Sequence, residues 1–215
     1  MRVELLGTVR VRDDTGGPAH VGGPRAQTLL ALLALDAGRV VPAASLIDRL
    51  WDGEPPDGAR GALQSMISRL RGVLGEVIES HPAGYRLAVG RGSVDALAFE
   101  DLAGQGSRAL AAADPGRASA ILRQALALWR GPALAGLPAA GPAAGIAARL
   151  EELRRSATAD RIEADLAAAD ASDAAGLTAE LRTLVAEDPL AERPRALLMR
   201  ALYLVGRQEI GRAHV

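Results

Sequence analysis

The chain has 215 residues, which suffices for one large domain or two small ones, each with its own core. A formal net charge of −1 excludes binding through a uniformly basic surface, so any contact with nucleic acid requires a local cationic patch. Cysteine is absent, which excludes disulfides and thiolate zinc sites, and the longest apolar run, residues 28–35, is too short to span a bilayer. We therefore expect a cytoplasmic protein without a membrane segment.

The first part of the chain, residues 1–93, mixes strand and helix patterns and is predicted to form one α+β domain. Alternating apolar residues favour strands, whereas apolar residues three and four apart favour helices. In chain order the expected elements are a strand pair (3–6 and 9–11), a helix from Pro24 that ends before Gly38, a short strand (40–41) and a helix (42–51).

A third helix, predicted from Gly58 to Leu74 with Asp57 as its N-cap, is the most informative element. Its apolar residues recur at spacings of three and four and predict one buried stripe: Leu63, Met66, Ile67, Leu70 and Leu74. The rest of its surface carries small, polar or cationic side chains suited to a DNA groove: Arg60, Gly61, Gln64, Ser65, Ser68, Arg69 and Arg71.

A hairpin is predicted after this helix, with strands at 77–79 and 85–89 around a turn-rich tip at 81–84. The segment 58–91, which spans the helix and the hairpin, holds five arginines and two glutamates, a local balance of +3. Because the whole chain is nearly neutral, this segment is the candidate nucleic-acid-binding patch.

Plainer roles compete for several of these side chains. Arg69, Arg71 and the polar residues beside them could lie on an ordinary solvated helix face, as surface residues usually do. The apolar stripe opposite them and the hairpin that follows favour DNA contact by at least one of the two arginines. Trp51 and Tyr85 are expected to pack in the core, not to stack on bases.

The sequence offers no candidate for catalysis, a metal or a cofactor. His20, His81 and His214 are too far apart for a ligand spacing on one helix. Lysine is absent, which excludes a phosphate-loop lysine and a Schiff base, and no serine lies in a Gly-x-Ser-x-Gly turn. We therefore predict a protein that is not an enzyme and has no catalytic residue, metal site or cofactor.

The second part of the chain, residues 94–208, is rich in Ala and Leu with helical periodicity throughout, which predicts an all-α domain. Small residues that face large ones favour tightly packed helix pairs of the tetratricopeptide type. The expected helices are 97–113, 116–129, 143–169, 174–187 and 191–205. The predicted fold class is thus a winged helix-turn-helix domain followed by a helical-repeat domain.

Several short motifs, in their order and spacing, carry a resemblance to a known family. In the first domain they are Arg39-Val40-Val41-Pro42, Leu50-Trp51-Asp52-Gly53-Glu54-Pro55-Pro56, Ser68-Arg69-Leu70-Arg71 and Gly84-Tyr85-Arg86-Leu87. In the second they are Phe99-Glu100-Asp101-Leu102, residues 125–132 (ALALWRGP) and residues 184–190 (LVAEDPL). The chain resembles the Streptomyces antibiotic regulatory proteins, in which a response-regulator-type (OmpR/PhoB) winged helix precedes a bacterial transcriptional activation domain.

The resemblance implies a homodimer on direct repeats of double-stranded DNA in a promoter, with the third helix in the major groove and the hairpin tip at the adjacent minor groove. The helical domain would contact partner protomers or RNA polymerase. The predicted DNA-binding residues, which include four arginines of the patch, are Arg60, Gln64, Ser65, Ser68, Arg69, Arg71, His81 and Arg86. Many winged helices have arginine at the tip position of His81, so weaker minor-groove reading is expected here.

The predicted function is sequence-specific regulation of transcription, as an activator of secondary-metabolite genes by resemblance. One alternative is a helical-repeat scaffold whose winged helix contacts protein. Another is a fragment of a larger nucleotide-controlled regulator with an ATPase module elsewhere. Residues 209–215 depart from the Ala-rich helix that the family implies and can be encoded by GAG ATC GGA AGA GCA CAC GTC, which resembles a sequencing adapter. We therefore hypothesise an assembly artefact there and an incomplete helical domain.

Overall fold

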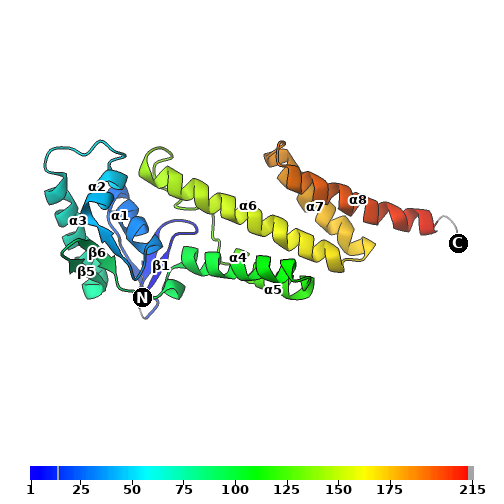
Figure 1. The fold of residues 1–215 in the computed structure, drawn as a ribbon, viewed down its shortest axis with the longest axis horizontal. Coiled ribbons are helices and arrows are strands. Elements are labelled where there is room, and N and C mark those ends of the chain that lie inside the picture. The colour runs from blue at the N-terminus through cyan, green and yellow to red at the C-terminus, as the bar shows by residue number, and fades with distance from the viewer. Residues whose placement is uncertain (14, 213–215) are drawn as a thin grey trace. The chain divides into compact units, whose positions relative to one another are not determined.

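The computed structural model describes residues 1–13 and 15–212, without the side chains of Ala171 and residues 207–212. The chain divides into two compact units, each of which contains two stretches of the sequence. Figure 1 shows the helices and strands, coloured from blue at the N-terminus to red at the C-terminus. The first unit comprises residues 1–101 and 127–153, and the second comprises residues 102–126 and those from 154 onwards. The predicted domain boundary between residues 93 and 94 stays a prediction.

Two small antiparallel sheets belong to the first unit. One contains β1 (Arg2–Glu4), β2 (Arg10–Arg12) and β3 (Pro18–Ala19) in that order, and Val3 pairs with Val11. The other has the order β4-β6-β5, formed by β4 (Val40–Pro42), β5 (Ile78–His81) and β6 (Gly84–Leu87). The leading strand pair, the short strand and the hairpin are confirmed. The sequence pattern missed β3, since two residues are too few to show alternation.

Three helices complete the winged-helix fold: α1 (Pro24–Leu35), α2 (Ala43–Leu50) and α3 (Ala59–Leu74). The predicted stripe on α3 is buried at Leu63, Ile67, Leu70 and Leu74, and each such side chain contributes about 1.5–3 kcal/mol of hydrophobic stabilisation. The predicted cap is wrong. Gly58, not Asp57, stands before the first turn, with the positive φ of 78° that glycine tolerates, and no side chain caps this helix.

The first unit also includes the start of the sequence predicted as the helical domain. Val94 is fully buried and pairs with Val3 in an isolated parallel bridge. The segment after residue 127 runs beside the leading strands, where the backbone amides of Arg130 and Leu134 donate to the carbonyls of Leu6 and Leu5. The core of the winged-helix unit therefore extends beyond the sequence that forms its sheets and its first three helices.

The second unit is all-helical. The helices of this part of the chain are α4 (Asp95–Ala111), α5 (Pro115–Leu126), α6 (Pro142–Ala168), α7 (Ala171–Glu187) and α8 (Glu192–Arg212). Two of them, α4 and α6, contain residues of both units. Asp170 caps α7 by accepting from the amide of Asp173 at 2.9 Å. The α7–α8 pair closes over a core with large buried side chains at Ile162, Leu166 and Leu181.

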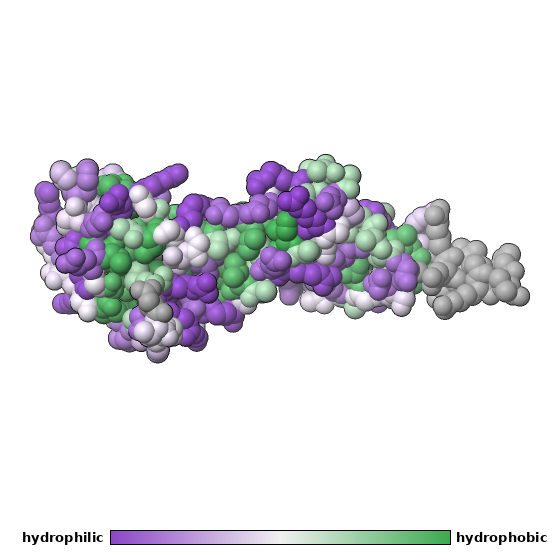
Figure 2. Space-filling view, turned by 90° about the horizontal axis from the view of Figure 1, so that it is seen from below, coloured by the Kyte–Doolittle hydropathy of each residue, from purple (hydrophilic) through white to green (hydrophobic). Residues whose placement is uncertain are grey.

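All five helices predicted for this part are confirmed, and the predicted fold class, α+β followed by all-α, is correct. Hydrophilic residues alternate with smaller apolar patches on the face shown in Figure 2. None of the helices described is long and apolar enough to cross a membrane. Of the segment 209–215, the structure describes only the backbone of residues 209–212, so the adapter hypothesis falls outside the described side chains.

Candidate nucleic-acid interface

The candidate interface begins with the exposed face of α3. Five of the predicted residues share this face and are exposed: Arg60, Gln64, Ser65, Ser68 and Arg69. Within the part of the chain that the structure describes, their side chains have no hydrogen bond or ion pair to another residue. Two guanidinium groups with all five N–H donors available therefore stand beside small hydroxyl and amide groups, which suits base edges and phosphates.

The β5–β6 hairpin forms a wing beside α3. Its tip has two residues, Pro82 and Ala83, because His81 and Gly84 still pair. The wing is tied to the rest of the sheet, since β6 pairs with β4 and the amide of Ala43 donates to the carbonyl of Ala83 at 3.0 Å. A Cβ at Gly84 would overlap the carbonyl oxygen of Val41 and is therefore not tolerated in this geometry.

Arg71 and Arg86, both in the predicted set, make intramolecular contacts. The Nε of Arg71 donates to the carbonyl of Ile78 at 2.7 Å, and a second guanidinium nitrogen donates to Ser80 Oγ at 2.8 Å. Arg71 thus joins α3 to β5. Arg86 pairs across the wing with Glu79, at 2.8 Å from Nε to Oε2, which offsets its charge. Their contact with DNA stays a prediction, and the structure gives both a role in holding the wing.

The remaining predicted residue, His81, is exposed at the end of β5. Its Nδ1 accepts a long hydrogen bond of 3.3 Å from the amide of Ala83. Trp51 and Tyr85, expected in the core, are each half-buried. The guanidinium carbon of Arg25 lies 5.5 Å from the centroid of the Trp51 ring, in the range of a cation–π contact.

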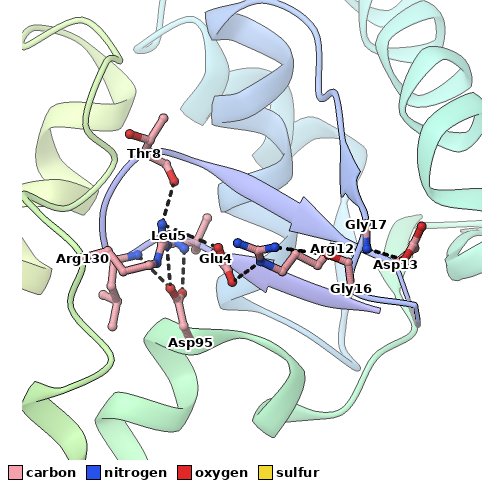
Figure 3. A network of polar contacts seen from close by, with 10 residues as sticks. Glu4, Leu5, Thr8, Arg12, Asp13, Gly16, Gly17, Asp95 and Arg130 are labelled. Atoms are coloured by element: carbon pink, nitrogen blue, oxygen red, sulfur yellow. Dashed lines mark hydrogen bonds and ion pairs between the residues drawn. The ribbon is translucent and has the colours of Figure 1, made fainter.

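A polar joint that sequence reasoning missed holds the first unit together (Figure 3). The buried carboxylate of Asp95, the first residue of α4, accepts from the amides of Leu5 at 2.6 Å and Leu6 at 3.1 Å. It also pairs with Arg130 at 3.1 Å. Arg130 in turn lies 3.6 Å from Glu4, whose other oxygen accepts from Arg12 at 3.0 Å.

The sequence contains little indication that these residues would form a joint. Asp95 and Arg130 are 35 residues apart, and only the Trp129-Arg130-Gly131-Pro132 motif marks one of them. The neighbouring Trp129 packs edge-on against Phe99, with ring centroids 5.3 Å apart. Beyond this, no group of three or more His, Cys, Asp or Glu residues in the described chain is placed to hold a metal ion.

A wing beside a helix that presents a polar, cationic face, followed by helical hairpins, defines a class of DNA-binding transcriptional regulators. Comparison with known families agrees. Residues 20–87 match the family described as "Transcriptional regulatory protein, C terminal", and residues 94–210 match the bacterial transcriptional activator domain. The chain belongs to the family of Streptomyces antibiotic regulatory proteins, which combine these two domains.

Individual relatives match nearly the whole chain. The chain is 39% identical to the transcriptional regulator RedD of Streptomyces coelicolor, over 97% of this chain and 61% of RedD. It is 36% identical to the regulatory protein DnrI of Streptomyces peucetius, over 96% of this chain and 79% of DnrI. Among solved structures, Mycobacterium tuberculosis EmbR in complex with a low-affinity phosphopeptide matches with a TM-score of 0.86 and 33% identity, over 97% of this chain and 56% of EmbR. The chain thus spans less than two thirds of RedD and of EmbR.

Proposed function

We propose that this chain binds duplex DNA sequence-specifically through α3 and regulates transcription, as an activator of secondary-metabolite genes. The observation that carries the proposal is the exposed α3 face with its two arginines, Arg60 and Arg69, which pair with no carboxylate among the described residues. Unpaired arginines are common on protein surfaces, because exposed ion pairs contribute little. What distinguishes Arg60 and Arg69 is that they share one helix face with small polar side chains, as a DNA-reading helix requires. Membership in a family of regulators supports the same conclusion.

Each part of the interface has a distinct proposed role. Arg60 and Arg69 contact guanines or phosphates, and Gln64, Ser65 and Ser68 contact base edges and nearby phosphates in the major groove. A bidentate arginine–guanine contact contributes about 1–3 kcal/mol of discrimination between bases. Loss of a phosphate contact, by contrast, weakens binding to all DNA sequences by a similar amount. His81 meets the adjacent minor groove from the wing tip.

The assembly that we propose is a homodimer on direct repeats in a promoter. The helical unit contacts the partner protomer or RNA polymerase, and the protein works in the cytoplasm without catalysing a reaction. Within the winged-helix unit, the Asp95–Arg130 joint fixes the first turn of α4 to the segment that follows β1.

Selection of bound fragments from random duplex DNA, followed by a gel-shift titration of the full chain, tests the proposal. Loss of the two free arginines in the variant Arg60→Ala/Arg69→Ala should weaken binding and reduce its salt dependence, because fewer counterions are released. The matched control Arg117→Ala/Arg182→Ala removes the same charge from exposed positions of the second unit and should leave binding close to that of the unmodified chain. Equal binding by both double variants would favour the protein-scaffold function.

A further inference from the structure

A groove of about 750 Å³ runs between α3 and the turn that precedes α1. One wall is formed by α3 residues, among them Ser65, Met66 and Arg69, and the other by the segment from His20 to Ala26. Trp51 also lines the groove. Two of the residues on the proposed DNA-reading face, Ser65 and Arg69, therefore belong to this groove as well.

The charge of the groove has one sign. Its ionisable lining residues are His20, Arg25 and Arg69, and no acidic residue is among the described residues that line it. By contrast, a second groove of about 490 Å³ in the same unit is lined by Arg49 together with two acids, Asp48 and Asp52. The groove beside α3 is thus suited to an anion, whereas the second groove is not.

Arg25 gives the groove a cationic side chain that comes from outside α3. It is exposed, and within the described part of the chain its guanidinium pairs with no carboxylate. The contact with the Trp51 ring, at 5.5 Å, restrains the guanidinium beside the groove while leaving its N–H donors free in the plane of the group. A restrained cation loses less conformational entropy when it binds a ligand.

We propose that this groove holds the sugar-phosphate backbone of one DNA strand, with Arg25 as a phosphate contact outside α3 and Trp51 as the residue that positions it. The inference rests on the proposed function, since a helix in the major groove lies between two phosphate strands and one of them must pass along its side. The apolar side chain of Met66 in the α3 wall accommodates deoxyribose, and the cationic side chains that line the groove accommodate phosphate. Base reading remains with α3, so Arg25 supplies affinity without sequence preference.

The test is fluorescence anisotropy of the full chain with a duplex selected from random DNA, at salt concentrations between about 50 and about 200 mM. Loss of one phosphate contact reduces the slope of log affinity against log salt by about 0.9. The fall in affinity over this fourfold range of salt should therefore be about 3.5-fold smaller in Arg25→Ala than in the unmodified chain. The ratio of affinities for selected and unrelated duplexes should not change, because phosphate contacts carry no base information.

Two further variants separate the roles of charge and position. Arg25→Lys should keep the salt slope, and Trp51→Leu should keep the slope but weaken binding, because the cation remains and is no longer restrained. Arg117→Ala, which removes one exposed arginine of the second unit, is the matched control and should leave both quantities unchanged. An Arg25→Ala slope equal to that of Arg117→Ala overturns the inference.

The outcomes also distinguish this inference from the proposed function. If the unmodified chain shows no salt-dependent binding to any duplex, the proposed function fails and the groove has no DNA to hold. If the unmodified chain binds and Arg69→Ala weakens it while Arg25→Ala does not, only the phosphate contact in the groove fails. A drop in the specificity ratio for Arg25→Ala would instead assign Arg25 to base reading and overturn its role as a phosphate contact.

Discussion

The carboxylate of Asp95 and the guanidinium of Arg130 lie 3.1 Å apart, one at the first turn of α4 and the other in the segment after α5. The same carboxylate accepts from the amides of Leu5 and Leu6, which directly follow β1, so three stretches of chain meet at one buried anion. An anion there also interacts favourably with the amino end of α4. The winged-helix unit therefore depends on residues outside its own stretch of sequence.

Replacement of Asp95 by asparagine should lower the free energy of unfolding by about 3 kcal/mol, the lower end of the range for removing one partner of a buried ion pair. The amide keeps the size of the side chain but presents N–H groups to the existing donors of Leu6 and Arg130. Urea unfolding measures the change. The control is Asp101→Asn, which breaks the exposed pair with Arg91 and should cost about 0–1 kcal/mol. Equal effects of the two substitutions would mean that the joint adds no stability.

The wing should not tolerate a side chain at Gly84. The added methyl of Gly84→Ala would meet the Val41 carbonyl and lie 2.8 Å from Pro42 Cα, so the strand must shift, at a cost of about 1–3 kcal/mol. Gly90→Ala is the control, because nothing lies within 4 Å of a Cβ at that position and its φ of −71° suits alanine. Thermal unfolding of both variants should show a lower melting temperature for Gly84→Ala and an unchanged one for Gly90→Ala. A melting temperature unchanged in both would contradict the close packing of β6 on β4.

Arg69 and Arg71 are two residues apart in α3, yet their substitution by alanine should have different effects. Arg71→Ala should destabilise the wing by about 1 kcal/mol, because two hydrogen bonds from a half-exposed cation to β5 are lost. Arg69→Ala should leave stability within about 0.5 kcal/mol and act on DNA binding alone. Hydrogen exchange across residues 76–87 is the discriminating measurement. Slower or equal exchange in Arg71→Ala would show that this arginine does not hold the wing.

The second unit should lose stability in acid partly through Asp165. Burial raises the pKa of this carboxyl, but hydrogen bonds from Ser119, Arg123 and Arg161 outweigh burial and hold the pKa below its ordinary value. The stabilisation is therefore present above the unfolded pKa of about 3.9 and is lost as pH falls through the lower folded value.

In Asp165→Asn this component is absent at every pH, so the difference in urea midpoint between the variant and the unmodified chain should shrink as pH falls from about 7 to about 3. Asp188→Asn is a matched control, because among the described residues its exposed carboxylate accepts only from the amide of Leu190. A constant difference between Asp165→Asn and the unmodified chain across this range would contradict the assignment.

Local pattern sufficed for much of the fold. The stripe of α3, the hairpin and the five later helices were all predicted, because the spacing of apolar residues directly reflects the period of each element. The exposed face of α3 followed from the same periodicity, since residues opposite a buried stripe must face solvent. Asp57 failed as a cap because the choice between it and Gly58 depends on backbone angles that composition does not specify.

The amino-acid sequence alone therefore determined which segments are helical and which face of α3 is polar, and it carried the family resemblance. It did not determine the fate of individual charges. Tertiary structure left Arg69 free, bound Arg71 to the wing and joined Asp95 to Arg130, because partners brought together from distant segments have no common spacing in the chain. A guanidinium has the same chemistry in each of these places, and only the neighbours that folding supplies decide whether it is held in intramolecular contacts or remains exposed and unpaired.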